Sequence, residues 1–377
     1  MNLRKYFIGL LFFASFLSLI AQPNYRVEVK IPDIPGYKTL KCDFHSHTVF
    51  SDGTVWPTFR IEEAWRDGLD AIAITDHIEY QPHKDYIPTN HNAAYEIGKN
   101  LAKELGLILI QGSEITRDMP PGHLNAIFIT DANALVKDTW KEAIKAAVDQ
   151  GGLVFWNHPG WRGQQPDGVP RWYDEHTYLY ENKLITGIEV VNSIEYYPAV
   201  FEWCLENNLA ILGNSDIHNP INFDYGKNRR PITLVFATDR TSEGIKEAII
   251  NRGTAVFYDG KIYGEEKYLK PLFNESIHFA TTDVNNVGRG TANIKVTNNS
   301  DIDFELRLAG TDEVIRFPEY IKLLAGTTMM FPIRARKDNT DVNKKYSVVY
   351  AVENLITGAD KNLKVTIDFN VKVIPKK

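Results

Sequence analysis

The sequence predicts an α/β barrel followed by a smaller all-β domain. Apolar runs typical of buried strands alternate with helix-like segments over roughly the first two thirds of the chain, which indicates βα units. Most of these strand-like runs end in His, Asp or Glu. From about Lys267 onward we expect no further helix, and short alternating runs lie between Asn, Asp and Gly turns, as in a β-sandwich. A length of 377 residues suits two domains. We place them at residues 22–265 and 266–377.

The composition is that of an ordinary globular protein. Hydrophobic residues make up 44% and charged residues 24% of the chain, close to the usual values. The formal net charge of -6 argues against a protein that binds long nucleic acid, because such proteins are normally basic. A small anionic substrate held at a local metal cluster is compatible with this charge. The sequence does not predict an oligomeric state.

The N-terminus has the pattern of a signal peptide. Arg4 and Lys5 precede an apolar run over Tyr6–Ile20, and Ala21 is a small residue suited to cleavage. We therefore expect residues 1–21 to direct export to the periplasm or beyond, with no stable membrane insertion after cleavage. The run is short for a membrane span; an uncleaved N-terminal anchor is the alternative.

The chain has two cysteines, Cys42 and Cys204. They could pair in an exported protein. However, Cys42 lies in a predicted strand and Cys204 in a helical pattern, so we expect buried free thiols.

The first predicted strand, Tyr37–Phe44, leads into His45 and His47. Side chains alternate along a strand, so these two imidazoles point to the same side and could bind one cation. Asp52 follows after a short turn and could reach the same place. Because a His-x-His pair often arises by chance, the prediction depends on how the later strands end.

Six further strands are predicted in this part of the chain. They are Leu69–His77, Leu107–Glu114, His123–Ile129, Gly152–His158, Ile185–Val191 and Leu209–His218. The intervening helices are expected at Pro57–Asp67, Ala93–Leu105, Thr139–Gln150, Ala199–Asn207 and Ser242–Asn251. A strand over Pro231–Phe236 and a hairpin edge at Ala255–Gly260 close the domain. With about seven βα units, a parallel sheet closed into a barrel is the most economical arrangement.

Ionisable side chains recur at the ends of these strands. Five of the seven strands end in His, Asp or Glu, and a sixth begins with His, whereas the strand Ile185–Val191 carries no evident ligand. In a parallel barrel the C-terminal strand ends form one rim, where ligands gather. The collected residues are His45, His47, Asp52, His77, Glu114, His123, His158, Asp216 and His218. This distribution predicts a converging metal site.

The motifs that carry these residues resemble the PHP (polymerase and histidinol phosphatase) superfamily of metal-dependent phosphoesterases. In chain order they are Asp43–Thr48 with Ser51–Gly53, Ile74–His77, Gly112–Thr116, Asn157–Pro159 and Ser215–His218. The resemblance extends over roughly residues 38–262. It implies a distorted seven-stranded barrel and a cluster of two or three divalent ions. Nitrogen and oxygen ligands without Cys suit Mn, Fe or Zn.

The resemblance also implies how the ligands are shared. His45, His47, Glu114 and Asp216 would hold the first ion. Glu114 would bridge to a second ion, also held by His123 and His158. Asp52, His77 and His218 would hold a third. The implied reaction is attack of a metal-bound hydroxide on the phosphorus of a phosphodiester or small phosphomonoester, without a covalent intermediate.

Other residues near these motifs are weaker candidates. Arg117 and Arg162 follow ligand residues and could bind phosphate oxygens, although either could be an ordinary surface charge. Trp156, Trp161 and Trp172 could wall a pocket for an apolar leaving group, but packing is the commoner role of such residues. The remaining histidines of the predicted barrel, His83, His91 and His176, are expected at the surface, and His83, shortly after His77, is the one that could instead line the rim.

Two other classes of function stay open at this point. One is another amidohydrolase-like metallohydrolase that acts on a lactone or a C–N bond. The other is a non-catalytic protein that binds a metal or a glycan. The first class typically uses a bridging carboxylated Lys, and no Lys occupies the position of Glu114. The β-sandwich is expected to have a structural or docking role, with carbohydrate binding as the alternative.

Overall fold

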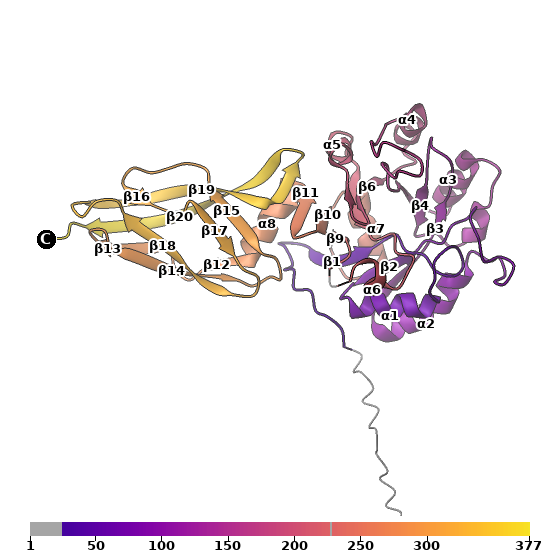
Figure 1. Cartoon of the computed structure of the whole chain (residues 1–377), viewed down its shortest axis with the longest axis horizontal. Helices are drawn as coiled ribbons and strands as arrows, with labels where there is room; N and C mark the ends of the chain where they lie inside the picture. Colours follow the sequence, from indigo (N-terminus) through magenta and orange to yellow (C-terminus); the bar gives the residue numbers. More distant parts are fainter. Residues whose placement is uncertain (1–24, 227) are drawn as a thin grey trace, which may run out of the picture.

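The computed structural model describes residues 25–226 and 228–377, which form an α/β part and an all-β part side by side (Figure 1). The predicted signal peptide lies outside the described residues. In the described ranges, no helix is long and apolar enough to cross a bilayer. Cys42 and Cys204 are buried and free, as expected.

The α/β part contains a mixed sheet. Its strands are β1 (Lys38–Asp43), β2 (Ala71–Ile74), β3 (Ile108–Ile115), β4 (Leu124–Ile127), β5 (Leu153–Trp156), β6 (Gly187–Asn192), β7 (Glu195–Tyr196), β8 (Ala210–Asn214), β9 (Ile232–Ala237), β10 (Thr254–Tyr258) and β11 (Lys261–Gly264). β1, β2 and β3 are parallel neighbours, as are β5, β6 and β8. A bridge between Ser46 and Ile217 brings the end of β8 beside the end of β1.

The expectation of a parallel sheet does not hold for β4 or β9. β4 runs antiparallel to both β3 and β5, because a loop without a helix joins β3 to β4 and returns the chain at the same end of the sheet. β9 likewise runs antiparallel to β1. The start of β4 therefore lies at the end of the sheet where β3 finishes.

Helices pack around this sheet (Figure 1). They are α1 (Pro57–Arg66), α2 (Ala93–Leu105), α3 (Trp140–Asp149), α4 (Asp174–Glu181), α5 (Pro198–Glu206), α6 (Ile221–Asp224) and α7 (Ser242–Ile250), with a 3₁₀ turn η1 (Ala132–Leu135). The five predicted helices are confirmed to within one residue at each end. Pro57 at the start of α1 and Gly106, left-handed with φ of 69° at the end of α2, are boundary signals that the sequence carries.

The all-β part is preceded by a helix that the sequence analysis missed. α8 (Glu266–Ser276) begins where the helical pattern was expected to end. It contains Pro271, a residue that usually argues against a helix interior. Its buried residues Tyr268, Leu269, Leu272 and Phe273 nevertheless pack into the large core cluster shared with the all-β part.

The all-β part has two packed sheets. Its strands are β12 (Ile277–Phe279), β13 (Asp283–Val287), β14 (Thr291–Asn298), β15 (Phe304–Leu308), β16 (Ile315–Arg316), β17 (Tyr320–Leu323), β18 (Thr328–Ala335), β19 (Val342–Gly358) and β20 (Lys361–Ile374). One sheet has the order β12-β14-β18-β16, and the other contains β13, β20, β19, β15 and β17.

The two parts are joined through the hairpin β10–β11. The sequence predicts this hairpin, but it is not a free edge: β11 pairs with β19 in parallel, with Ile262 opposite Leu355. Asn354 adds a side-chain connection, because its amide donates to Gly260 O at 2.9 Å and to Asp303 O at 2.7 Å. The all-β part is therefore docked on the edge of the α/β sheet.

Candidate metal centre

The nine residues of the predicted site lie at one end of the α/β sheet. His45, His77, His158 and Asp216 each lie two or three residues after the end of a parallel strand. His123 immediately precedes β4, and because β4 is antiparallel, its start lies at the same end. The antiparallel strand therefore explains why a histidine at a strand entry joins residues at strand exits.

Four side chains converge at the centre of this group. His45 Nε2 lies 3.0 Å from His47 Nε2 and 3.1 Å from Glu114 Oε2. Asp216 Oδ1 lies 3.1 Å from His45 Nε2 and 3.0 Å from His47 Nε2. His45, His47 and Glu114 are fully buried. This arrangement places the four predicted ligands of the first ion within reach of a single cation.

A second group lies on the more exposed side. Asp52 Oδ1 is 3.2 Å from His218 Nε2, 3.5 Å from His77 Nε2 and 3.8 Å from His47 Nδ1. The four ligand atoms lie within 4.8 Å of one another. We call Asp52, His77, His218 and His47 the outer group. It contains the three predicted ligands of the third ion and adds His47.

The third group is arranged differently from the prediction. Glu114 Oε1 lies 2.7 Å from His123 Nδ1 and 3.6 Å from His158 Nε2. Glu114 and His123 cluster with His77, whereas His158 clusters with His45 and Asp216. The prediction grouped His158 with Glu114 and His123 around the second ion. In the structure His158 clusters with His45 and Asp216, two of the predicted ligands of the first ion.

Two buried atoms show that these residues fit a cation. Glu114 Oε1 and His123 Nδ1 are buried, and neither has a hydrogen-bond partner among the described residues. They nonetheless face each other at 2.7 Å. A buried acceptor without a donor is costly, and a shared divalent ion would satisfy both atoms. The surrounding set of imidazoles and carboxylates suits Mn, Fe or Zn.

The ligand side chains shift one another's pKa values in both directions. Burial and the neighbouring His218 and His77 lower the pKa of His47 to about 3, which leaves its nitrogen lone pair free. Burial would raise the pKa of Glu114, but His77, His45 and His123 outweigh it and hold that pKa well below its usual value. The surrounding carboxylates outweigh burial and raise the pKa of His45, His77 and His218, so a divalent ion would bind here by displacing protons from these imidazoles.

The backbone at two of these residues is strained. His158 and Asp216 have positive φ angles of 28° and 52°, a region that non-glycine residues seldom adopt. Such conformations persist where the surrounding structure enforces them, often at functional sites. Here they turn each side chain back toward the cluster directly after a strand.

The loop that carries Asp52 is fixed by Asp76. The Asp76 carboxylate accepts hydrogen bonds from Thr48 N at 2.6 Å and Ser51 Oγ at 2.7 Å. Gly53 is required for the tight return of this loop, because a Cβ there would lie 2.6 Å from Thr48 N. The Ser-Asp-Gly sequence thus places Asp52 over the imidazoles.

Glu189 on β6 is a site residue that the sequence analysis missed. Its Oε1 lies 2.9 Å from His45 Nδ1, and its Oε2 accepts from His158 N at 2.8 Å. The contact orients the His45 ring and leaves Nε2 for the cluster, as carboxylates behind metal-binding histidines do. A glutamate inside the apolar run Ile185–Val191 was the available signal, since a buried carboxylate needs partners.

The two arginine candidates lie in different surroundings. Arg117 is held by Lys137 O at 2.7 Å, Asp138 O at 3.2 Å and Glu79 Oε1 at 2.8 Å. Its charged nitrogens are therefore occupied away from the nine ligands. Arg162 is exposed, and no ion pair to it occurs in the described ranges. It follows Trp161, whose ring lies 5.6 Å from that of His123 and 5.4 Å from that of His158.

Two of the histidines expected at the surface are buried. His176 is 0% exposed and stacks on Trp156 with ring centres 3.7 Å apart. Its Nε2 donates to Pro121 O at 2.8 Å, and its Nδ1 accepts from Tyr173 N at 3.0 Å. His91 is also buried. The helix α4 that buries His176 has a weak apolar pattern, which is why its sequence did not indicate it.

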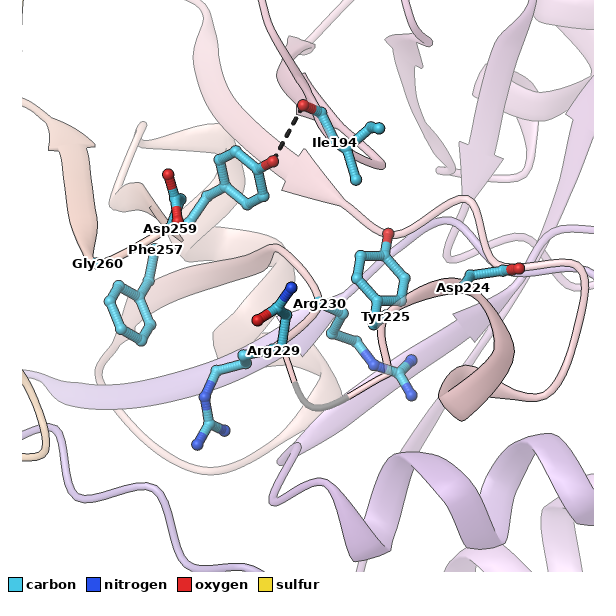
Figure 2. A pocket seen from close by; sticks show the side chains of 10 residues that line it. Ile194, Asp224, Tyr225, Arg229, Arg230, Phe257, Asp259 and Gly260 are labelled. Carbon is cyan, nitrogen blue, oxygen red and sulfur yellow. Dashed lines mark hydrogen bonds between the residues drawn. The ribbon is translucent and has the colours of Figure 1, made fainter.

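A cavity of about 360 Å³ lies between Tyr225, Arg229 and Arg230 on one side and residues 257–260 on the other (Figure 2). None of its lining residues belongs to the nine. Two of them nevertheless support the ligand segment: Tyr225 donates to Ser215 O at 2.9 Å, and Arg230 donates to Asp43 Oδ2 at 3.2 Å. Asp43 in turn accepts from Ser215 N at 3.1 Å. The cavity is thus next to the supporting residues of the cluster and not over its ligand atoms.

Comparison with known proteins agrees with both parts of the chain. A family model described as a PHP domain matches residues 43–208, and a model described as an Ig-like domain matches residues 277–368. A crystal structure from Bacteroides vulgatus is of a two-domain protein containing a predicted PHP-like metal-dependent phosphoesterase. It is 43% identical, with a TM-score of 0.86, and the match covers 91% of this chain and 99% of that chain.

A curated relative matches a shorter region. An uncharacterized protein of Methanocaldococcus jannaschii is 38% identical over 82 residues, which are 22% of this chain. The match covers 36% of the length of that protein. It therefore adds similarity over one segment only.

Proposed function

Because the chain belongs to the PHP family of predicted metal-dependent phosphoesterases, we propose that it hydrolyses phosphodiesters or small phosphomonoesters. The observation that carries the proposal is the convergence of nine ligand side chains, among which the buried atoms Glu114 Oε1 and His123 Nδ1 face each other at 2.7 Å without a well-directed hydrogen bond. We propose that a distorted seven-stranded barrel, closed between β8 and β1, holds these side chains in place.

The chain's own residues provide the binding and orientation that the reaction needs. His45, His47, Glu114 and Asp216 would hold the first ion, and the outer group another, while Glu114 Oε1 with His123 and His158 completes the set. Two or three divalent ions, when bound, neutralise phosphate oxygens and make water acidic enough to react near neutral pH. Glu189 keeps the Nε2 atom of His45 directed at the cluster.

Substrate would enter from the side of the outer group. His218 is the most open of its imidazoles, with a side chain 32% exposed, and the side chain of Asp52 is 24% exposed. Trp161, which is 45% exposed, packs against His123 and His158. We assign phosphate binding to Arg162 rather than to Arg117, because the guanidinium of Arg117 is already occupied by two carbonyls and a carboxylate.

The setting of this activity is part of the same proposal. Residues 1–21 would direct export to the periplasm or the medium, and the substrate would be a small phosphoester and not long nucleic acid. The docked all-β part would act as a structural or docking domain. Arrest of export when Arg4, Lys5 and the apolar run are deleted would test the first point.

The activity itself is tested with a panel of substrates on the metal-loaded chain. Bis-(p-nitrophenyl) phosphate, p-nitrophenyl phosphate and a lactone are compared under the same conditions. We expect turnover of at least one phosphoester and none of the lactone. Turnover of the lactone alone would rule out the phosphoesterase and favour a different metallohydrolase.

A further inference from the structure

Helix α1 carries two arginine–glutamate pairs in contrasting surroundings. Arg60 pairs with Glu63, with Nη1 2.6 Å from Oε2, and both residues are buried. Arg66 pairs with Glu62 at the same distance of 2.6 Å, but their side chains are 43% and 32% exposed. The buried pair is the unusual one, because a charge pair removed from water seldom adds net stability.

The remaining donors of Arg60 reach the backbone of the metal centre. Nε donates to His47 O at 3.1 Å, and Nη2 donates to His218 O at 3.0 Å. Nη1 also donates to Asn219 O at 3.0 Å. Arg60 thus connects the segment after β1 to the segment after β8 through two residues that belong to the outer group.

These contacts leave the ligand atoms free. The guanidinium bonds to main-chain oxygens and not to the imidazoles, whose rings stack with centres 4.2 Å apart and planes 19° apart. Thr54 N donates to His218 O as well, at 2.9 Å. The planar fork of an arginine can serve several carbonyls at once, which the single ammonium of a lysine cannot do in the same geometry.

We propose that Arg60 is a positioning residue that fixes His47 relative to His218 and thereby sets the affinity of the outer group for its divalent ion. The proposal rests on the metal centre proposed above. It accounts for a buried charge that stability alone does not explain. It also predicts a selective effect, because Arg60 makes no hydrogen bond or ion pair with His123, His158 or Glu114 among its described contacts.

The test compares Arg60→Lys with Arg66→Lys, a matched change on the same helix. Each chain is stripped with chelator and titrated with Zn²⁺ or Mn²⁺, and bound ions are counted by elemental analysis after gel filtration. Loss of an orienting contact behind a ligand typically weakens metal binding about 10- to 100-fold. We expect that loss for the ions that share His47 in Arg60→Lys, wild-type binding of the ion held by His123 and His158, and no change in Arg66→Lys.

A second variant covers a failure of Arg60→Lys to fold. Arg60→Met with Glu63→Leu removes both buried charges, a replacement that folded proteins often tolerate, and it should show the same selective loss. Wild-type affinity for every ion in a folded variant would overturn the role of Arg60. A wild-type chain that binds no ion would instead overturn the metal centre, and the proposal with it.

Discussion

The two parts of the chain differ in what they bury. Within residues 277–377 the buried polar side chains are Asn298, Ser300, Asn354 and Thr357, none of which is ionisable. The α/β part buries many ionisable side chains. They include Lys41, Asp43, His45, His47, Arg60, Glu63, Asp70, Asp76, His77, His91, Glu114, His123, His158, His176, Glu189 and Arg230.

The difference in buried ionisable side chains shows that the chain does not need them to build a stable domain. Burying a charge is unfavourable unless it is paired, and the all-β part shows that this chain builds a packed domain without doing so. The same holds for the backbone: His158 and Asp216 are strained, whereas residues 277–377 contain no non-glycine residue with positive φ. Positive φ also occurs at six other non-glycine residues of the α/β part, so it is the combination of buried charges with this backbone at ligand residues that is typical of a reactive site.

Removal of the metal ions should have the largest effect. Without cations, the buried Glu114 and the partly buried Asp216 remain ionised beside imidazoles, and no ion is left to bind the phosphate oxygens. We therefore expect loss of phosphoesterase activity by at least about 1,000-fold. A ligand present at about 1,000 times its Kd stabilises by about 4 kcal/mol, so the unfolding free energy of the α/β part should fall by a similar amount. The measurement is activity and calorimetry before and after chelation and after metal is restored.

The domain contrast supplies the control for this prediction. A calorimetric transition of the all-β part should shift little on chelation, because no ligand lies there. Equal shifts in both parts would contradict the contrast.

The buried imidazole of His176 should make the stability of the α/β part depend on pH. Burial lowers its pKa to about 4, and Tyr173 N already occupies the Nδ1 lone pair that a proton would need. The unfolded chain therefore binds the proton more readily. The contribution of neutral His176 to the free energy of unfolding is complete above about pH 6.5. It is lost as the pH falls toward 4, and the loss is about 3 kcal/mol at most.

Denaturant unfolding between pH 4 and 7 tests this expectation. His176→Phe keeps a ring against Trp156 and should have a flatter pH dependence than the wild type. His278→Phe, which removes an exposed imidazole from the all-β part, is the matched control. The same flattening in both variants would show that burial of His176 is not the cause.

Glu189→Gln should weaken metal binding without emptying the site. The glutamine amide has no negative charge with which to hold the Nδ1 side of the His45 ring. Loss of such a carboxylate behind a ligand typically lowers the affinity for the metal ion about 10- to 100-fold. Competition with a chromophoric chelator measures the affinity. Glu195→Gln, on the neighbouring strand β7, serves as the control. Affinity unchanged in Glu189→Gln would mean that Glu189 only fills space.

Asn354→Ala should have the smallest effect and should leave metal content unchanged. The amide joins Gly260, Asp303 and Glu305 across the domain junction, and unmaking buried hydrogen bonds costs about 1–3 kcal/mol. Asn370→Ala, which loses an exposed contact to Asp283, should change stability by less than about 0.5 kcal/mol. Metal loss in Asn354→Ala would show that the parts are coupled and not separate.

Much of the fold could be predicted from local signals. The ends of α1 and α2 follow from Pro57, Gly68 and Gly106, which act within one turn of the chain. α8 was missed because Pro271 contradicts its helical pattern. The antiparallel direction of β4 was missed because strand direction depends on how the connecting loop folds.

The candidate site likewise contains residues that the sequence indicates and residues that only the structure reveals. Eight of the nine ligand candidates could be selected from sequence because they lie within four residues of a strand end, and Asp52 because it follows in the Ser-Asp-Gly turn. The structure places all nine together. Glu189 and Arg60 could not be selected with the same rule. An arginine in an amphipathic helix looks like a surface charge, and only the packing of α1 against the ends of β1 and β8 reveals its contacts.

The most direct test of the central claim is a count of bound ions. The chelator-treated wild-type chain and the double variant His45→Ala, His47→Ala are each saturated with Mn²⁺ or Zn²⁺ and passed over a desalting column. The ratio of metal to protein is then measured. The account predicts two or three ions per wild-type chain, and loss of both metal and activity in the double variant. Equal metal content in the two proteins would contradict it.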